Sequence, residues 1–248
     1  MFETLQYRLL RTIAPTDPPH TVGGSAYEGR SKLRALLGEE QISSCVDRVV
    51  LDFGCGIGAE AVELAQLGAR RVIGLDIQTS RLEQGRVLAR AAGVEDRCVF
   101  TETSDEPAEI VISLDAFEHY DDPESILATM HGLLKPGGLV FISFGWPWLH
   151  PYGGHLFSVF PWAHLLFSER ALIRWRSDIR SDGARRFSEV EGGLNQMTLG
   201  RAERLCAASE FIVREFRSVP IRRLRWLHNR LTREFTSATV RITLQRKS

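Results

Sequence analysis

Three glycines at alternate positions, Gly54, Gly56 and Gly58, are the residues whose type and spacing point most directly to chemistry. They follow the apolar run Val49–Phe53 and precede alanines and leucines at helical spacing, so the stretch predicts a strand, a tight turn and a helix. Glycine adopts positive φ at little cost and lets a ligand lie against the backbone. The helix that follows presents free N–H groups at its N-terminus. The pattern is typical of a nucleotide-binding α/β unit.

A carboxylate ends the second predicted strand. Asp76 directly follows the apolar run 71–75 and lies 18 residues beyond Gly58. An acidic side chain at this place can accept hydrogen bonds from both ribose hydroxyls of an adenosine. Such charge-assisted bonds contribute about 1.5–3 kcal/mol each. The alternative, that Asp76 caps the next helix, explains the spacing less well.

The elements that must position these residues alternate between strands and helices. Ligands of such sheets lie beyond the carboxyl ends of the strands, so the loop 114–119 after the fourth strand belongs to the site by position. We predict strands at 49–53, 71–76, 97–101, 109–113, 139–144, 211–219 and 239–244, and helices at 30–42, 58–67, 79–92, 122–134, 198–209 and 222–233.

Two segments fall outside this alternation. Residues 1–29 contain several prolines and glycines and are predicted to form an irregular arm with a short helix at 5–13. Residues 145–196 are rich in aromatic side chains and too long for a simple connection. We interpret them as an inserted helical and aromatic cap over the carboxyl edge of the sheet, within one domain that spans residues 30–248.

The glycine stretch, Asp76, the loop 114–119 and the Leu-Leu-Lys-Pro-Gly-Gly turn at 133–138 together resemble the class I S-adenosylmethionine-dependent methyltransferases, small-molecule branch. The resemblance covers roughly residues 30–144. It implies an α/β fold with a Rossmann-like, doubly wound, seven-stranded and mostly parallel sheet whose last strand is antiparallel. It also implies S-adenosyl-L-methionine as cofactor and S-adenosyl-L-homocysteine as product.

The resemblance further implies which residues hold the cofactor. The family usually places an acidic and a polar residue after strand three to hold the adenine amino group, but that segment is short here, so Glu102 and Thr103 are candidates only. In chain order, the resemblance assigns Asp52, Gly54, Gly56 and Gly58 to the methionine part of the cofactor, Asp76 to the ribose, Ile77 to the adenine, and Asp115 and Ala116 to the surroundings of the sulfonium.

Histidines are the candidates for a general base, which is needed if the methyl acceptor is an alcohol or a phenol. His119 lies in the loop after strand four, where its alternative role is to start a helix or contact the cofactor. His155 follows two glycines of the cap, where its alternative role is structural. No spacing of histidines and carboxylates predicts a metal site.

The cap is expected to enclose a small-molecule acceptor, methylated on oxygen. Most of its aromatic side chains should form its core, because irregularly spaced aromatic clusters usually pack together. The candidates for contact with the acceptor are those nearest the end of strand five, namely Trp146, Trp148, His150 and Tyr152.

Two other functions are compatible with parts of the sequence. Residues 169–248 hold 18 basic and 9 acidic side chains, and the Arg-rich stretch 222–233 suggests an RNA methyltransferase. The sequence lacks the Asn-Pro-Pro-aromatic motif typical of base methylation and any recognisable RNA-binding module, which disfavours a nucleic-acid partner. Gly54, Gly56 and Ala59 also satisfy the dinucleotide fingerprint of an NAD-dependent dehydrogenase, but no second mononucleotide-binding half follows.

The bulk composition is that of an ordinary globular protein, with 44% hydrophobic and 25% charged residues in a chain of 248. No apolar run approaches the length of a membrane span, and the N-terminal residues lack the order of a signal peptide. The four cysteines are scattered, so we expect reduced thiols and a cytoplasmic protein. The sequence makes no prediction of the oligomeric state.

Overall fold

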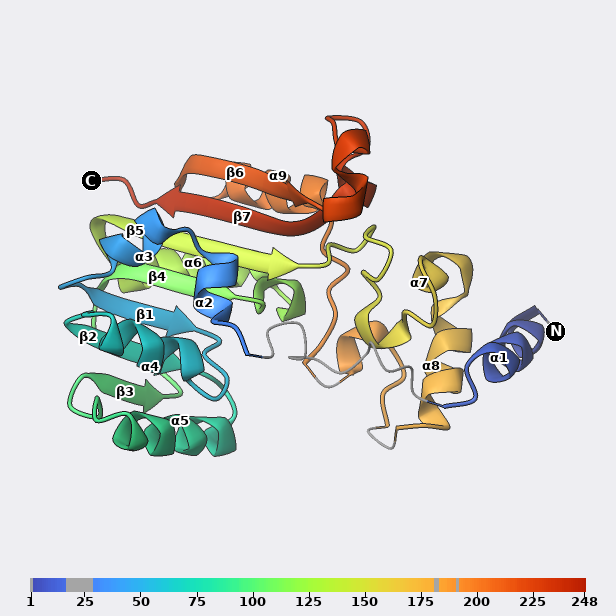
Figure 1. Cartoon of the computed structure of the whole chain (residues 1–248), viewed down its shortest axis with the longest axis horizontal. Helices are drawn as coiled ribbons and strands as arrows, with labels where there is room; N and C mark the ends of the chain where they lie inside the picture. Colours follow the sequence, from blue (N-terminus) through green and yellow to red (C-terminus); the bar gives the residue numbers. More distant parts are fainter. Residues whose placement is uncertain (1, 17–28, 181–182, 191) are drawn as a thin grey trace.

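The computed structural model describes residues 2–16, 29–180, 183–190 and 192–248. Its centre is a seven-stranded sheet in the order β3-β2-β1-β4-β5-β7-β6 (Figure 1). β7 is antiparallel to both of its neighbours, β5 and β6, whereas β1 to β5 pair in parallel. The predicted fold class is therefore confirmed. The strands are β1 (Val49–Phe53), β2 (Arg71–Leu75), β3 (Cys98–Thr101), β4 (Ala108–Leu114), β5 (Leu134–Gly145), β6 (Ile212–Pro220) and β7 (Ser237–Gln245).

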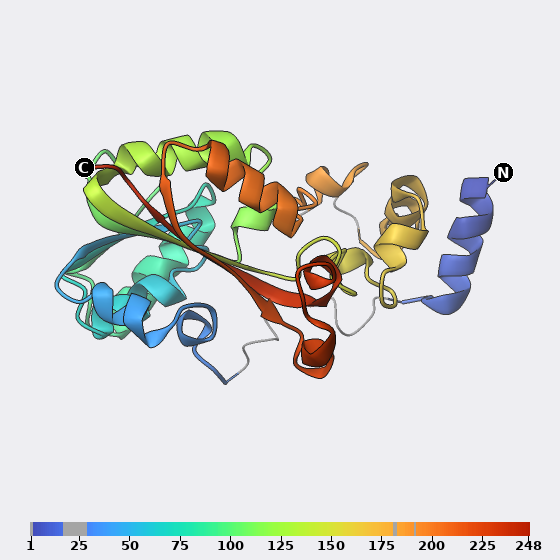
Figure 2. The ribbon, with the colours of Figure 1, turned by 90° about the horizontal axis from the view of Figure 1, so that it is seen from above.

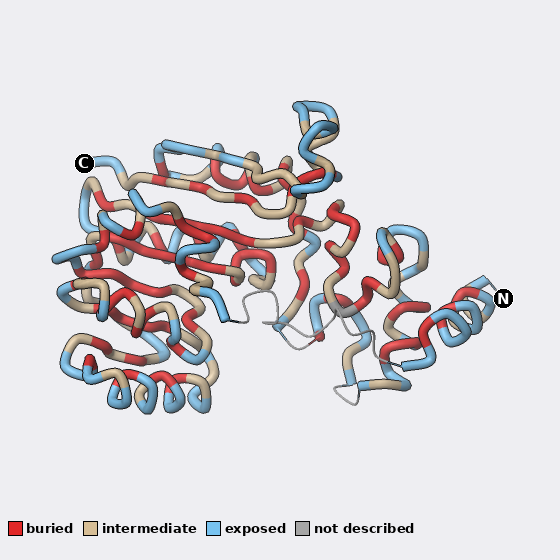
Figure 3. The backbone as a smooth tube through the Cα atoms, in the orientation of Figure 1, coloured by how far each residue is buried: buried red, intermediate tan, exposed pale blue. Residues whose placement is uncertain are grey.

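Helices cover both faces of the sheet, which explains why its central strands are continuous apolar runs. One face packs Leu33, Leu64 and Leu82 from the helices against the strands, and the other packs Met130 and Leu205. Burial is densest along these strands (Figure 3). The first face carries α2 (Lys32–Leu36), α3 (Glu39–Ser44), α4 (Ala59–Gln66) and α5 (Thr79–Ala91), and the second carries α6 (Pro123–Leu133) and α9 (Leu199–Ala208).

Three local predictions need correction. The predicted helix 30–42 is two helices, because the chain is extended at Leu37 and Gly38. The Lys-Pro-Gly-Gly turn lies inside β5, where the pairing with β4 shifts register. The predicted basic helix 222–233 is a 3₁₀ helix, η5 (Arg222–Leu227), followed by the short α10 (Arg233–Thr236). Asn229 interrupts it, since its Oδ1 accepts hydrogen bonds from the N–H groups of residues 231 and 232.

The cap has a hydrophobic core of its own, separate from the two cores of the sheet. It contains η3 (His155–Phe157), α7 (Ala163–Leu166), α8 (Glu169–Ser177) and η4 (Phe187–Glu189), and α1 (Phe2–Ile13) packs against α8. Figures 1 and 2 show these helices grouped at one end of the molecule, beyond the carboxyl ends of the parallel strands.

The N-terminal segment therefore belongs to the cap. Leu10 is fully buried in the cap core, and the Trp175 indole donates a hydrogen bond to the Ala14 carbonyl at 2.7 Å. Residues 2–13 form a regular helix, which is longer than the predicted 5–13. The part of the predicted irregular arm at 17–28 lies outside the described residues.

No helix in the described part of the chain is long and apolar enough to span a membrane. The same residues contain no group of three or more histidine, cysteine or acidic side chains arranged to hold a metal ion. All four cysteines are free and buried.

Candidate functional site

The glycine turn has the backbone that its sequence predicts. Gly54, Gly56 and Gly58 have φ values of +79°, +54° and +76°. A Cβ at Gly54 would lie 2.7 Å from the Tyr120 hydroxyl, and one at Gly58 would overlap the Phe100 ring. A Cβ at Gly56, in contrast, would meet nothing within 4 Å. The first and third glycines therefore permit close packing beneath the turn, whereas Gly56 faces open space where a ligand can approach.

The Asp76 carboxylate accepts a hydrogen bond from the glycine turn, and its oxygens can accept further hydrogen bonds from a ligand. Its Oδ2 accepts from the Gly56 N–H at 2.9 Å, and its Oδ1 accepts from the Gln78 N–H at 2.8 Å. Each carboxylate oxygen has a second lone pair, so both can also accept from a diol. The neighbouring Ile77 is 90% exposed, which leaves a bare apolar side chain beside the carboxylate.

Asp52 is a buried carboxyl group at the base of the turn. Burial, reinforced by the nearby Glu60 carboxylate, raises its pKa to about 8. Its Oδ2 is buried and has no hydrogen-bond partner in the described part of the chain. An orphaned acceptor, a diol-binding carboxylate and an exposed isoleucine around open glycine backbone fit the amino acid, ribose and adenine parts of S-adenosylmethionine.

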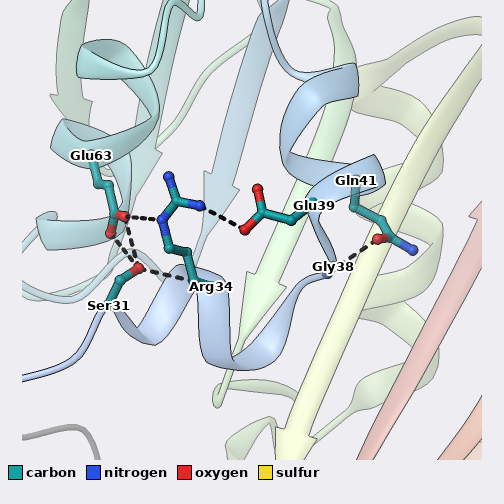
Figure 4. A network of polar contacts seen from close by, with 6 residues as sticks. All are labelled: Ser31, Arg34, Gly38, Glu39, Gln41 and Glu63. Carbon is teal, nitrogen blue, oxygen red and sulfur yellow. Dashed lines mark hydrogen bonds and ion pairs between the residues drawn. The ribbon is translucent and has the colours of Figure 1, made fainter.

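Lys32 reaches this edge of the sheet from α2. Its ammonium group donates to the Leu114 carbonyl at 3.2 Å and lies 3.9 Å from the Asp115 carboxylate. A polar network fixes α2 on α4: the Ser31 hydroxyl caps α2 and also donates to Glu63 at 2.7 Å (Figure 4). Sequence reasoning missed Lys32; its rarity was a usable signal, because Lys32, Lys135 and Lys247 are the only lysines in the chain.

The loop after β4 is tied to the end of the cap. The Asn195 side-chain amide donates to the carbonyls of Phe117 at 2.9 Å and Tyr120 at 2.8 Å, and its backbone N–H donates to the Glu118 carbonyl. The Glu118 carboxyl group is buried, and burial together with the nearby Asp115 carboxylate raises its pKa well above the usual value. Asn195 was also missed, since nothing in its sequence neighbourhood marks it.

His119 is oriented by the same segment. Its Nδ1 lies 2.8 Å from the Gly193 carbonyl oxygen. Because a carbonyl can only accept, Nδ1 carries the proton and Nε2 keeps its lone pair. Burial lowers the pKa of His119, so the ring is neutral at pH 7.

The structure brings the predicted histidines together with the first cap aromatic residues. The rings of His119 and His155 are 5.6 Å apart, edge to face, and the Trp146 ring lies 6.1 Å from His155. Trp146 stacks on His150 at 5.6 Å and lies 6.0 Å from the Tyr152 ring. We name these five residues the histidine–tryptophan cluster; it lies where β4 and β5 end.

The two cap histidines of the cluster are neutral for the same reason. Burial lowers the pKa of His150 to about 4 and that of His155 to about 3. The His150 Nδ1 accepts from the Tyr152 N–H at 3.0 Å, which commits it to holding the loop. The His155 Nε2 is buried and has no hydrogen-bond partner among the residues that the structure describes.

The remaining predicted residues lie at different distances from this centre. Ala116 packs beneath Gly54. Glu102 is exposed and accepts from the Thr79 hydroxyl at 2.7 Å, while the Thr103 carbonyl accepts from Thr101. Trp148 packs into the cap core against His164 and Phe187 rather than joining the histidine–tryptophan cluster.

A comparison with known protein families finds a match to the part of the chain that contains the glycine turn. Residues 51–142 match the sequence model of a methyltransferase domain. The match begins inside β1, includes the glycine turn and the loop after β4, and ends in β5. It assigns the nucleotide-binding motif to the methyltransferases rather than to the dehydrogenases.

Two curated relatives match the same part of the chain. The ribosomal protein L11 methyltransferase of Shewanella pealeana is 37% identical over 95 residues, which are 38% of this chain and 32% of that protein. The ubiquinone biosynthesis O-methyltransferase of Neisseria meningitidis serogroup C is 35% identical over 101 residues, which are 38% of this chain and 42% of that protein. The chain thus spans less than half the length of these relatives.

The likeness of the whole fold extends further than the sequence match. An S-adenosylmethionine-dependent methyltransferase from Mesorhizobium loti superposes with a TM-score of 0.56 over 90% of this chain and 99% of its own, at 18% identity. At that identity the superposition establishes the fold alone.

Proposed function

Because residues 51–142 are a class I S-adenosylmethionine-dependent methyltransferase domain, we propose that the chain transfers the methyl group of this cofactor to an oxygen of a small-molecule acceptor. The observation that carries the proposal is the histidine–tryptophan cluster at the carboxyl ends of β4 and β5. It puts flat apolar rings and neutral imidazoles at the edge of the sheet where such folds bind their ligands.

The residues around the glycine turn would hold the cofactor. Asp76 would accept from the ribose hydroxyls, Ile77 would lie against the adenine, and Asp52 would face the methionine part. Asp115, held near Lys32, and Ala116 would lie beside the sulfonium. The cofactor supplies an activated methyl group, so the protein's contribution is chiefly alignment, which can lower a barrier by about 7–11 kcal/mol.

His119 is the leading candidate for the general base. The Gly193 carbonyl fixes the tautomer that leaves Nε2 free to take the proton from an acceptor hydroxyl. His155 stays neutral, and its Nε2 is available for a hydrogen bond that orients the same hydroxyl. Trp146 and Tyr152 would contact the ring of the acceptor, which favours a planar phenol or enol.

The two curated relatives support different acceptors. The name of the ubiquinone biosynthesis enzyme states methylation on oxygen, and the name of the L11 enzyme states a protein acceptor. The structure of this chain supports a small acceptor, because His150 and the Nε2 of His155 are buried within the cluster. A compact acceptor reaches such buried groups more readily than a protein surface does.

The test is a transfer assay with methyl-labelled S-adenosylmethionine and four acceptor pools: phenols, small amines, ribosomal proteins and RNA. We expect label on the phenols, at the oxygen by mass spectrometry, and none with the Asp76→Ala variant. Label on amines, protein or RNA would refute the acceptor proposal, and cofactor binding measured by calorimetry separates that result from a failure to bind cofactor.

A further inference from the structure

The connection between β6 and β7, residues 221–236, carries the most exposed large apolar side chains of the C-terminal third. Leu231 is 91% exposed and Trp226 is 79% exposed, and the nearby Phe235 is 44% exposed. Figure 3 shows this connection as a largely exposed projection from the sheet. Exposed aromatic and aliphatic side chains of this size on one short connection mark an interaction site.

The connection is held rigidly from beneath. The His228 ring bridges the Ser218 hydroxyl at 3.1 Å and the Thr236 hydroxyl at 2.9 Å. Arg233 pairs with Glu203 of α9 at 2.6 Å. These contacts hold the connection against β6, β7 and α9 at His228 and Arg233, close to the exposed Trp226 and Leu231.

The charge of the connection is strongly one-sided. Its one acidic residue, Glu234, is engaged with the N-terminus of α9, where its oxygens accept from the N–H groups of Leu199 at 3.0 Å and Gly200 at 2.7 Å. Four arginines are exposed and have no acidic partner among the described residues. They are Arg222, Arg223, Arg225 and Arg230.

We propose that residues 221–236 bind the surface of an anionic lipid bilayer. In this arrangement Trp226 and Leu231 enter the headgroup and acyl boundary, and the four arginines contact lipid phosphates. Apolar side chains beside unpaired basic ones are the combination that interfacial binding uses. RNA would use the arginines and could stack on Trp226 but has no use for an exposed leucine. An acidic protein would likewise leave the apolar tip without a partner.

The position of the connection agrees with this proposal. The Ala238 carbonyl of β7, two residues after the connection, accepts from the Trp146 N–H at 2.9 Å. The proposed lipid contact and the histidine–tryptophan cluster thus lie at the same end of the sheet. If the proposed function holds, a lipophilic acceptor would enter from the bilayer close to the cluster, although lipid binding itself does not depend on it.

The experiment is cosedimentation of the full chain with vesicles of phosphatidylcholine, with and without phosphatidylglycerol. We expect binding to the anionic vesicles only, weakened by salt. Trp226→Ser with Leu231→Ser should weaken it at least about tenfold. Arg223→Gln should weaken it about fivefold, in line with the electrostatic contribution of one basic residue. The matched controls lie on α5: Val87→Ser with Leu88→Ser, and Arg90→Gln, should bind as the unmodified chain does.

Three results would overturn the proposal: equal binding to both kinds of vesicle, equal weakening by the α5 controls, or retention on an RNA oligonucleotide or polyglutamate without retention on vesicles. The variants replace exposed side chains, so thermal unfolding should be unchanged. Cofactor binding by calorimetry should also be unchanged, which keeps this test independent of the proposed methyl transfer.

Discussion

The two sides of the candidate site use the backbone differently. On the cofactor side, the positions with positive φ are glycines, namely Gly54, Gly56 and Gly58. On the acceptor side, Gly192 and Gly193 beside His119 have positive φ, but so do two aromatic residues of the histidine–tryptophan cluster, Trp146 at +43° and His155 at +49°. Where the two sides meet, beside the proposed position of the sulfonium, Asp115 also has positive φ, at +50°.

This difference shows what each side requires. A glycine in this conformation costs little and offers only backbone, which suits a ligand bound through close approach. A residue with a Cβ in the same region costs about 1–3 kcal/mol and persists only where surrounding contacts impose it. The acceptor side thus keeps its side chains in spite of strain, which indicates that their chemical groups are needed there. We expect changes on the two sides to separate cofactor binding from turnover.

The largest effect is expected from a substitution in the hydrophobic core of the cap, which is separate from the core beneath the glycine turn. Trp175→Ala removes a fully buried ring of the cap and its bond to Ala14, and should lower the stability of the cap by about 3–5 kcal/mol. Methyl transfer should be lost, while S-adenosylhomocysteine affinity, measured by calorimetry, should stay within about twofold because the glycine turn has a different core.

The matched change on the other side is Phe100→Ala. Its ring fills the space beside Gly58, Gly74 and Gly85, so its removal should loosen the glycine turn and abolish cofactor binding. If both variants lost cofactor affinity equally, the two sides would be one cooperative unit and the comparison would fail.

His119→Gln should lower kcat about 10²–10⁴-fold, because it removes the proposed proton acceptor while amide nitrogen can still reach the Gly193 carbonyl. The affinity for S-adenosylhomocysteine should not change. The control His131→Gln, on α6, should keep full activity. A kcat within about threefold of the unmodified chain would remove His119 from the role of base.

Asp76→Ala should weaken S-adenosylhomocysteine at least about 100-fold, since it deletes two charge-assisted acceptors and frees the N–H groups of Gly56 and Gln78. Calorimetry measures this directly. The exposed Asp96, in the turn between α5 and β3, provides the control Asp96→Ala. Unchanged affinity in Asp76→Ala would show that the ribose lies elsewhere.

The sheet was predictable because its signals are local. Apolar runs gave β1, β2 and β4, and the alternate glycines gave the turn, since φ preference and burial act within a few residues. The prediction of one basic helix at 222–233 was wrong for a reason that is also local, because the Asn229 side chain accepts backbone hydrogen bonds that compete with those of a helix.

The cap was predictable as a segment but not as a structure. Its core needs Leu10 and Ala14 from the other end of the chain, a contact that no pattern in residues 145–196 reveals. The same holds for Asn195 and Lys32, whose partners lie far away in sequence. Trp148 shows the limit at single residues: closeness to the end of β5 did not decide whether it joined the cluster or the cap core.

The smallest expected effect is a difference in pH dependence between the two sides. Burial raises the pKa of Asp52 to about 8, so the folded chain keeps a proton that the unfolded chain releases above about pH 4. That contribution to stability is complete below the unfolded pKa and is lost as the pH rises towards about 8. Asp52→Asn should therefore exceed the unmodified chain in free energy of unfolding by an amount that grows over this range to at least about 1 kcal/mol.

His155 on the acceptor side should have the opposite effect on the slope of stability against pH. Burial lowers its pKa to about 3, so between about pH 6.5 and that value the unfolded chain binds a proton that the folded chain does not. Stability falls as the pH falls through this window, and His155→Gln should flatten that fall. The readout is the slope of unfolding free energy against pH in denaturant titrations, because the slope is insensitive to contacts that either substitution removes. If the two variants changed the slope in the same direction, the two buried groups would not titrate as their surroundings require.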